Sequence, residues 1–417
     1  MQYWNNLPKI SATLVALFLT SLVFAQENSP YSRYGIGNLK THENVANRGM
    51  GGVSIADDNP TIANPTNPAT YASLRLTSYQ VGMEGSRLGI KNANLTNQTG
   101  YAGINYVTIG FAASKKLGFS FGLLPASRVR YNMERTDTLS YSQATSSYSG
   151  GGGLQNVYVG GAYKHDIYSI GLNLGYTFGN YVNGTEVVFT DSLRIIPNNY
   201  NTRTSANGLF YQIGGLINKD ISKDYQLKVG LSYTGAQTLS SKKDEIWDYV
   251  ASDTIYYNDK KSSGKIKIPS KFAIGGIFSH GDHWQIGLDI NASNWEKYRS
   301  YGESDSLGQA YLIRIGGAYT PDANAVVDYW KKMTFRMGFY TGQDILRFQN
   351  ESLKKSAMTL GIGYPIRRTN LSIGQINASL ELGRRGVAEN GLVRESFTRF
   401  SVGLTFNDKW FIKRRYD

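Results

Sequence analysis

The chain of 417 residues has no cysteine and, after its first 25 residues, no long apolar run. Without cysteine there is neither a disulfide framework nor thiol chemistry. Without a run of roughly 20 apolar residues, the rest of the chain has no segment suited to a membrane-spanning helix. If this part crosses a membrane, it must do so as a closed β-barrel, because unpaired backbone groups are too costly in hydrocarbon.

The first 25 residues have the pattern of a secretory signal peptide. Lys9 supplies positive charge, and Ile10 to Phe24 is an apolar run that is too short for a comfortable membrane span. Ala25 then precedes polar residues. We expect residues 1–25 to be removed on export, with an approximate cleavage point because Val23 replaces the usual small residue.

Positive charge is in excess but is not concentrated. The chain has 44 Lys and Arg against 31 Asp and Glu, a formal net charge of +13. Because the cations are scattered rather than gathered on one motif, we do not expect nucleic-acid binding, and contact with anionic lipid head groups is simpler. The 30 tyrosines and 17 phenylalanines suit β-strands and aromatic girdles, although a soluble β-protein shares this composition.

Apolar and polar residues alternate with period two along much of the chain from Leu76 onward. In residues 284–292, for example, every second side chain is apolar. We expect fourteen strands near 76–88, 101–113, 117–132, 152–164, 168–183, 206–219, 225–238, 264–279, 284–298, 309–319, 331–343, 353–364, 372–384 and 398–406. This predicts an all-β fold, a 14-stranded antiparallel transmembrane β-barrel over residues 76–406 whose apolar face meets lipid.

The predicted connections alternate between long and short. The longest spans about residues 239–263 and is followed by a tight turn at 280–283. Long extracellular loops alternating with short periplasmic turns are typical of outer-membrane barrels, whereas a soluble sandwich has no reason to sort its loops this way. The predicted periplasmic connection 320–330 is longer than the others, and we interpret it as a decorated turn in which Ala323 to Trp330 can form a short helix.

Two further segments flank the predicted barrel. Residues 26–75 contain four prolines and several glycines, which disfavour regular elements, and are too short for an independent domain. We expect this segment to form a plug in the barrel lumen. Residues 407–417 carry aromatic and cationic side chains and predict a periplasmic tail, either an interface anchor or a docking peptide.

Short blocks of sequence carry a resemblance to a known family. They are Arg48-Gly49-Met50-Gly51-Gly52, Ala56-Asp57-Asp58 and Asn67-Pro68-Ala69, followed later by Ile268-Pro269-Ser270, Trp284 to Asp289 and Trp295. The first three resemble the N-terminal hatch of the FadL/TodX family of outer-membrane channels for hydrophobic compounds. The later block is also similar to that family, and fourteen is the family's number of strands.

The resemblance implies passive uptake of small hydrophobic molecules, such as long-chain fatty acids, without a cofactor. It implies hatch roles for Arg48, Gly49, Asp57, Asp58, Asn67 and Pro68. It also implies a lateral opening at a kink in the third strand, where Pro125 lies. Because proline cannot donate to the ladder, Pro125 marks either such a break or a bend above the membrane.

Alternation places four arginines on the expected lumen face: Arg128, Arg130, Arg314 and Arg336. An arginine there could hold the carboxylate of a fatty acid in a bidentate pair. The alternative is pairing with the protein's own carboxylates, such as Asp57, Asp58 and Asp289, since a buried charge without a partner is costly.

No constellation in the sequence predicts an enzyme or a metal site. His280 and His283 flank a predicted turn without further ligands nearby, and the glycine runs lack the strand–helix context of a phosphate loop.

A second function is suggested by the opening residues, Ser29 to Gly37. They are similar to the start of Bacteroidota members of the same superfamily, some of which serve envelope machines. The second hypothesis is therefore a scaffold subunit of an outer-membrane assembly for secretion or barrel insertion, with protein partners at residues 320–330 and 407–417. A soluble periplasmic β-protein is the third.

Overall fold

The computed structural model describes residues 28–410, apart from 93–95, 140–141, 190–197, 250–257, 326–327, 349–350, 368–372 and 390–391. The predicted signal peptide and residues 411–417 of the predicted tail lie outside the described residues. Among the described residues, no helix is both long and apolar enough to cross a membrane.

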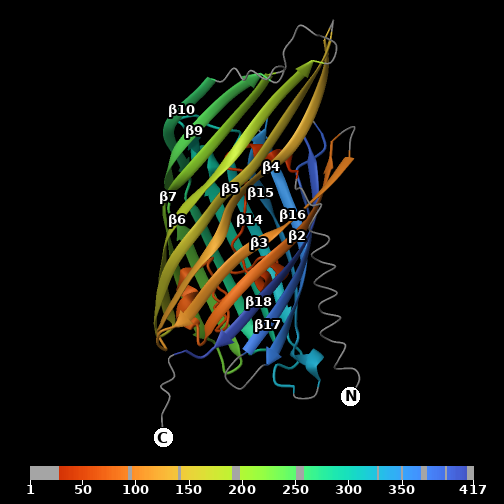
Figure 1. Ribbon diagram of the computed structural model, residues 1–417. Coiled ribbons are helices and arrows are strands. Elements are labelled where there is room, and N and C mark those ends of the chain that lie inside the picture. Colours follow the sequence, from red (N-terminus) through yellow and green to blue (C-terminus); the bar gives the residue numbers. More distant parts are fainter. Residues whose placement is uncertain are drawn as a thin grey trace, which may run out of the picture.

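Antiparallel strands form one closed barrel (Figure 1). Twelve of its strands are continuous: β2 (Thr77–Lys91), β3 (Thr96–Ala112), β4 (Leu117–Leu139), β5 (Ser142–His165), β6 (Tyr168–Phe189), β7 (Asn198–Asp220), β12 (Trp284–Asn294), β14 (Gln309–Tyr319), β15 (Thr334–Phe348), β16 (Glu351–Arg367), β17 (Ile373–Arg385) and β18 (Arg394–Asp408). Pairing of β18 with β2 closes the sheet.

The other two barrel strands are each interrupted by two residues. β8 (Tyr225–Thr234) continues as β9 (Gln237–Tyr249), and β10 (Asn258–Ile268) continues as β11 (Lys271–His280). Both β8 and β9 pair with β7, while β11 pairs with β8 and β10 pairs with β9. The fourteen-stranded antiparallel barrel predicted from the sequence is therefore confirmed.

The remaining elements are short. They are β1 (Asn38–Leu39), β13 (Arg299–Ser300), helix α2 (Val45–Gly49) and the 3-10 helices η2 (Pro30–Arg33), η3 (Pro68–Ser73), η4 (Trp295–Lys297) and η5 (Tyr329–Lys332). In the described part of residues 323–330, the helical residues belong to the 3-10 turn η5, and no α-helix is present there. The N–H of Asp322 donates to the carbonyl of Lys331 and so closes a loop instead.

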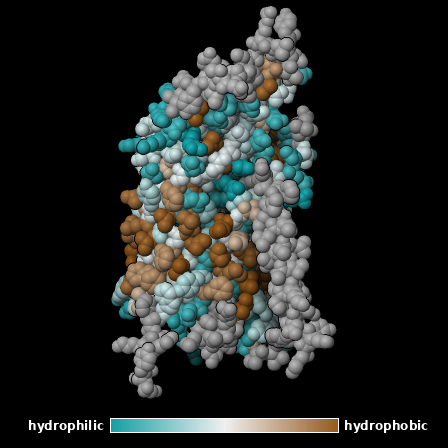
Figure 2. Space-filling view, in the orientation of Figure 1, coloured by the Kyte–Doolittle hydropathy of each residue, from teal (hydrophilic) through white to brown (hydrophobic). Residues whose placement is uncertain are grey.

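Exposed apolar side chains form a belt on the outer face, toward the end of the barrel where β18 finishes, and Figure 2 shows one side of this belt. Leu172 on β6 and Leu288 on β12 are 43% and 47% exposed, whereas their polar neighbours Asn173 and Asp289 are buried. This arrangement inverts that of a soluble protein, so the belt marks where the barrel meets lipid. The chain is a membrane-spanning barrel.

Strands on one side of the barrel extend far beyond the belt. β4, β5 and β6 contain 23, 24 and 22 residues, whereas β12 and β14 contain 11 each. In Figure 1 the long strands rise as a one-sided wall. Much of the predicted long loops at 133–151 and 239–263 is therefore strand, since these hairpins continue beyond the lipid.

Residues 28–76 lie inside the barrel, where most of their side chains are buried. Glycines on the wall allow the two backbones to touch. A Cβ added to Gly338 would lie 2.1 Å from the nitrogen of Gly51, and one added to Gly118 would lie 1.8 Å from the carbonyl oxygen of Tyr71. The segment therefore packs directly against the inner face of the sheet.

Candidate functional site

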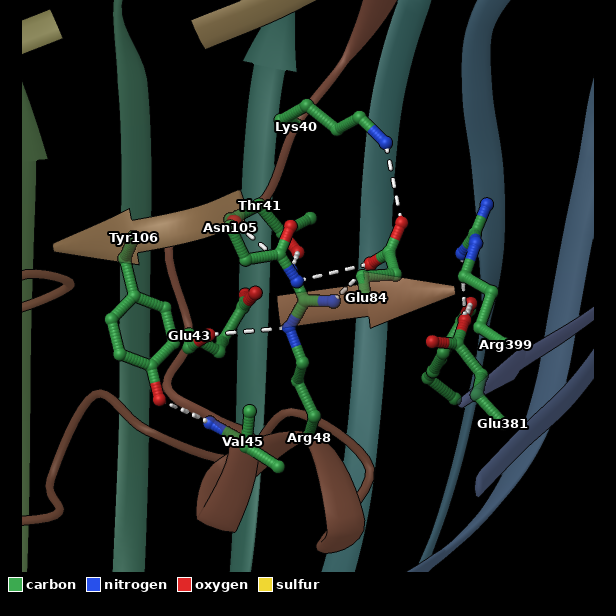
Figure 3. Close-up of polar contacts among 11 residues, drawn as sticks. Lys40, Thr41, Glu43, Val45, Arg48, Glu84, Asn105, Tyr106, Glu381 and Arg399 are labelled. Atoms are coloured by element: carbon green, nitrogen blue, oxygen red, sulfur yellow. Dashed lines mark hydrogen bonds and ion pairs between the residues drawn. The ribbon is translucent and has the colours of Figure 1, made fainter. Parts of the chain in front are cut away.

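Arg48 on α2 is the centre of a buried polar network in the lumen (Figure 3). Its guanidinium forms an ion pair with Glu84 of β2 and donates to the carbonyl of Glu43. The Glu84 carboxylate also accepts from Lys40 at 3.3 Å and from Asn105 at 3.1 Å. The Glu84 carboxylate thus binds two cationic side chains and one amide.

Two more ion pairs, one buried and one partly buried, lie near this network. Glu43 pairs with Arg314 of β14 at 2.8 Å, and Glu381 of β17 pairs with Arg399 of β18 at 2.9 Å. Burial alone would raise the pKa of Glu43, but the positive charges of Arg314 and Lys271 lower it to about 2. Glu43 is therefore a carboxylate at any physiological pH.

Wall residues also satisfy the backbone and carboxylates of the N-terminal segment. The Asp289 carboxylate accepts from the N–H of Ser54 at 2.6 Å and from the N–H of Ile55 at 3.0 Å. Asp58 forms an ion pair with Lys228 of β8 at 2.5 Å. These contacts attach the segment to β12 and β8.

The other predicted hatch residues make similar contacts. The Asn67 amide donates to the carbonyl of Gly215 at 3.0 Å, and Pro68 starts η3 so close to β6 that a Cβ added to Gly171 would lie 2.4 Å from its carbonyl carbon. The Gly49 carbonyl accepts from Thr359 at 3.1 Å. Asp57 instead stays within the segment, where it accepts from an asparagine of α2.

An apolar cluster packs around the first residues of the N-terminal segment. It joins Tyr31 and Ile36 of the N-terminal segment to the inner face of the wall and to the loop after β12. Its other buried members are Leu154, Ala206, Leu239, Ile266, Trp295, Tyr298, Leu307, Ile345, Leu346 and Leu353. We call this group the upper cluster.

The seam between β3 and β4 is interrupted. Residues 107–112 of β3 pair with residues 118–123 of β4, and the pairing ends there. Beyond this point β3 continues to pair with β2, and β4 continues to pair with β5. The break coincides with a register shift between Pro125 and Ser127 in β4.

N-terminal residues cover the unpaired edge of β4. β1 pairs with residues 127–128, the N–H of Lys40 donates to the carbonyl of Ala126 at 3.0 Å, and the N–H of Ser29 donates to the carbonyl of Arg130 at 2.9 Å. β4 thus finds in the N-terminal segment the backbone partners that β3 does not supply.

Asn28 reaches both edges of the seam. Its backbone N–H donates to the Thr99 hydroxyl of β3 at 3.2 Å, and its side-chain oxygen accepts from the N–H of Asn132 of β4 at 2.8 Å. We call residues 28–40 the seam segment and residues 41–76 the lumen segment. The first covers a break in the wall, and the second fills the barrel.

A family model with the description BamG matches residues 8–417. The chain belongs to the BamG family. No curated protein matches it at the level of sequence.

Solved structures share the fold of this BamG-family barrel at low sequence identity. A FadL homologue of Pseudomonas aeruginosa is 11% identical, with a TM-score of 0.61, and the match covers 90% of this chain and 100% of that one. The toluene transporter TbuX of Ralstonia pickettii is 15% identical, with a TM-score of 0.59 and 89% and 99% covered. The toluene transporter TodX of Pseudomonas putida is 15% identical, with a TM-score of 0.51, and the match covers 90% of this chain and 100% of that one.

Two of the four arginines predicted to face the lumen of the BamG-family barrel do not. Ser127 is the register partner of Leu154, which belongs to the upper cluster, so Ser127 faces inward. Arg128 and Arg130 therefore face outward, because the extra residue at the bulge reverses the alternation. The Arg128 guanidinium lies 3.5 Å from the ring centroid of Tyr101 on β3, across the interrupted seam.

The other two arginines do lie inside. Arg314 is paired with Glu43, and Arg336 donates to the Asn377 side chain at 3.2 Å. The sequence left two alternatives for these arginines, a ligand carboxylate or a carboxylate of the protein, and Arg314 has the second. Among the described residues, no ion pair includes Arg336.

Sequence reasoning missed Glu43, Glu84 and the seam segment of this BamG-family chain. Glu84 carried a usable signal, since a carboxylate in the middle of an alternating strand must face the lumen and needs a partner there. The seam segment carried none, because its partners lie about a hundred residues away in β4. His280 and His283 lie at the turn between β11 and β12, and no metal-binding group of side chains exists within the described residues.

Proposed function

We propose that this chain is an outer-membrane channel that admits small hydrophobic molecules, such as long-chain fatty acids, by a lateral route between β3 and β4. The observation that carries the proposal is the interrupted seam beside Pro125, covered by a segment outside the barrel ladder. Proteins of similar fold are described as toluene transporters and as monoaromatic hydrocarbon channels, which supports this class of substrate.

In this proposal the segment at residues 26–75 is the plug and residues 76–406 are the conducting barrel. Removing one partner from a buried ion pair costs about 3–5 kcal/mol, and the lumen segment is held by several such pairs. Movement of the whole plug is therefore unfavourable. A route through the wall avoids it.

Partial release of the seam segment is less costly. It is attached to β4 mainly by hydrogen bonds, each of which contributes about 1 kcal/mol net. On its other side, the Tyr31 hydroxyl donates to the carbonyl of Val393 and Arg385 donates to Asn38 at 2.8 Å. Displacing all of residues 28–40 would also expose Tyr31 and Ile36 and break the Lys40–Glu84 ion pair. The minor state that a ligand can select is therefore a local opening at the edge of β4, where each released hydrogen bond costs about 1 kcal/mol.

A disulfide across the covered seam tests this route. Leu39 and Ser127 are register partners, and the chain contains no cysteine of its own. We expect the double variant Leu39→Cys/Ser127→Cys to lose uptake of a labelled long-chain fatty acid when oxidised and to regain it on reduction. The matched control, Thr341→Cys/Ser356→Cys, joins two register partners on the continuous β15–β16 seam and is expected to transport in both states.

Uptake that is equal in the oxidised and reduced seam variants would exclude the lateral route. The disulfide itself is verified by a mobility shift on non-reducing gels, so a failure to cross-link is not mistaken for free passage.

A second function, a scaffold subunit of an outer-membrane assembly, is favoured by the filled lumen and by exposed aromatics at one end of the barrel. Tyr329 and Trp330 in the connection between β14 and β15 are 48% and 57% exposed. Together with the tail at 407–417, they would contact envelope proteins on the periplasmic side. Purification in mild detergent separates the two functions: stoichiometric protein partners support the scaffold, and a lone barrel that transports supports the channel.

A further inference from the structure

A cationic pocket lies outside the lumen, where the edge of β10 meets β13. It has a volume of about 440 Å³ and is lined by Ser263, Gly264, Lys265, Lys267, Arg299, Tyr301 and Gly302. None of the residues mentioned so far as plug, seam or ion-pair network takes part in it. Three of the seven lining residues are cations and none is an anion.

The cations of this pocket point away from the barrel lumen. Ile266 is fully buried in the upper cluster, so its neighbours Lys265 and Lys267 project from the opposite face of β10, where both are exposed. Arg299 is the register partner of Lys267 and therefore shares that face. The pocket opens toward the surroundings of the barrel.

The pocket lies beyond the upper limit of the apolar belt, on the polar side of the lipid interface. Tyr233, Phe272 and Tyr311 are exposed on β8, β11 and β14 and form an aromatic rim at the upper limit of the apolar belt. Such a rim marks the interface between hydrocarbon and polar head groups. Lys267 lies five residues beyond Phe272 along the same barrel strand, roughly 16 Å at about 3.3 Å per residue.

The backbone around the pocket is fixed in place. The N–H of Tyr301 donates to the carbonyl of Lys265 at 3.0 Å, and Tyr301 and Gly302 turn the chain with φ of 54° and 92°. Arg299 donates through one nitrogen, Nη1, to the carbonyls of Glu296 and Tyr298 at 2.7 and 2.6 Å. These bonds hold the guanidinium in one orientation, and its other nitrogens make no hydrogen bond within the described residues.

The pocket cations also differ from those of the lumen. Arg48, Arg314 and Lys228 are each paired with a carboxylate. Within the described part of the chain, no ion pair includes Lys265, Lys267 or Arg299. Like charges held together without an anion repel one another, so the site gains stability when an anion binds.

We propose that this pocket binds the phosphate of a phosphorylated glycolipid of the outer leaflet, a molecule of the lipid A class. The fixed guanidinium offers paired N–H groups to phosphate oxygens, and the two lysines add point charges. The acyl chains would lie against the apolar belt below, past Phe272 and Tyr311. This inference goes beyond transport, because it holds whether the barrel conducts or not.

The test uses the purified full-length protein in detergent, titrated with diphosphoryl lipid A and observed by native mass spectrometry. We expect the triple variant Lys265→Gln/Lys267→Gln/Arg299→Gln to bind this lipid at least tenfold more weakly. The matched control neutralises three exposed cations of other strands, Lys91→Gln, Lys354→Gln and Arg394→Gln, and is expected to stay within twofold of the unaltered protein.

Three results would overturn the proposal: equal affinity of the triple variant and the control, equal binding of fully dephosphorylated lipid A, or complete competition by millimolar inorganic phosphate, which indicates a site for free anions. Heat-modifiable gel mobility verifies that each variant is folded. Should the triple variant fail to fold, Lys265→Gln alone is expected to weaken binding severalfold, and unchanged binding by that variant would equally refute the pocket.

Discussion

The lumen segment and the seam segment are consecutive in the chain but are held by different forces. Residues 41–76 are fixed by buried ion pairs and by backbone contact with wall glycines. Residues 28–40 are fixed mainly by hydrogen bonds at the edge of β4, by the upper cluster through Tyr31 and Ile36, and at their end by the ion pair of Lys40 with Glu84. Breaking the buried ion pairs and close backbone contacts of the lumen segment is costly, whereas the hydrogen bonds of the seam segment can be released one at a time.

We therefore expect the lumen segment to stabilise the barrel and the seam segment to open locally. Changes in the lumen segment should lower the free energy of unfolding of the whole barrel. Changes in the seam segment should alter local opening with little global effect.

The largest expected effect is at the Arg48–Glu84 pair. Arg48→Met leaves the Glu84 carboxylate buried with fewer positive neighbours, so we expect the free energy of unfolding to fall by about 3 kcal/mol, with Lys40 limiting the loss. Urea titration of the barrel in lipid vesicles, followed by gel mobility, measures this quantity.

The matched control is Arg135→Met, which breaks an ion pair with Asp137 whose side chains are 72% and 45% exposed. A loss below about 1 kcal/mol is expected there. If the two variants unfold alike, the buried network does not stabilise the barrel.

The next effect concerns Asp289 of β12. Asp289→Ala leaves the N–H groups of Ser54 and Ile55 without acceptors in a buried site, which we expect to cost about 2–3 kcal/mol. Asp289→Asn keeps a carbonyl oxygen at the same place and should recover most of that stability. Equal losses for the two variants, in the same urea titration, would show that charge and not hydrogen bonding is what matters at this position.

A smaller effect distinguishes two adjacent glycines of β7. A Cβ at Gly214 would lie 2.0 Å from the Asn67 side-chain oxygen, whereas one at Gly215 meets nothing within 4 Å. We expect Gly214→Ala to lose about 1–3 kcal/mol by overpacking and Gly215→Ala to be neutral or slightly stabilising. Comparable melting of the two variants would mean that the lumen segment does not press against this strand.

Sequence alone predicted the barrel because lipid imposes a period of two on each strand that crosses it. The same reasoning underestimated β4 through β10, since beyond the belt both faces of a strand can carry polar residues and the alternation disappears. The predicted faces of Arg128 and Arg130 were wrong for a different reason. A one-residue bulge moves every later side chain of the strand to the opposite face. Pro125 indicates that a bulge is present but does not show at which position the extra residue lies.

The site was partly predictable for a related reason. The prolines and glycines of residues 26–75, together with the resemblance to the FadL/TodX hatch, predicted a plug, and Asp58, Asn67 and Gly49 do contact the wall. Their partners lie more than a hundred residues away, and no local pattern specifies such pairs. The seam segment has the same limitation, since its binding depends on the backbone of β4 and not on particular side chains.

The smallest expected effect is the one most specific to the seam. Asn28→Ala removes two side-chain hydrogen bonds to Asn132 but keeps the backbone contact with Thr99, so we expect no more than about 1 kcal/mol of global destabilisation. The loss should appear locally, as roughly fivefold faster amide exchange in residues 127–132 of β4, with residues 334–341 of β15 as the internal reference. Faster exchange in both regions would show that Asn28 stabilises the whole barrel, as the lumen segment does. Unchanged exchange in β4 would mean that the seam is closed by Arg128 and Tyr101 and that residues 28–40 do not cover it.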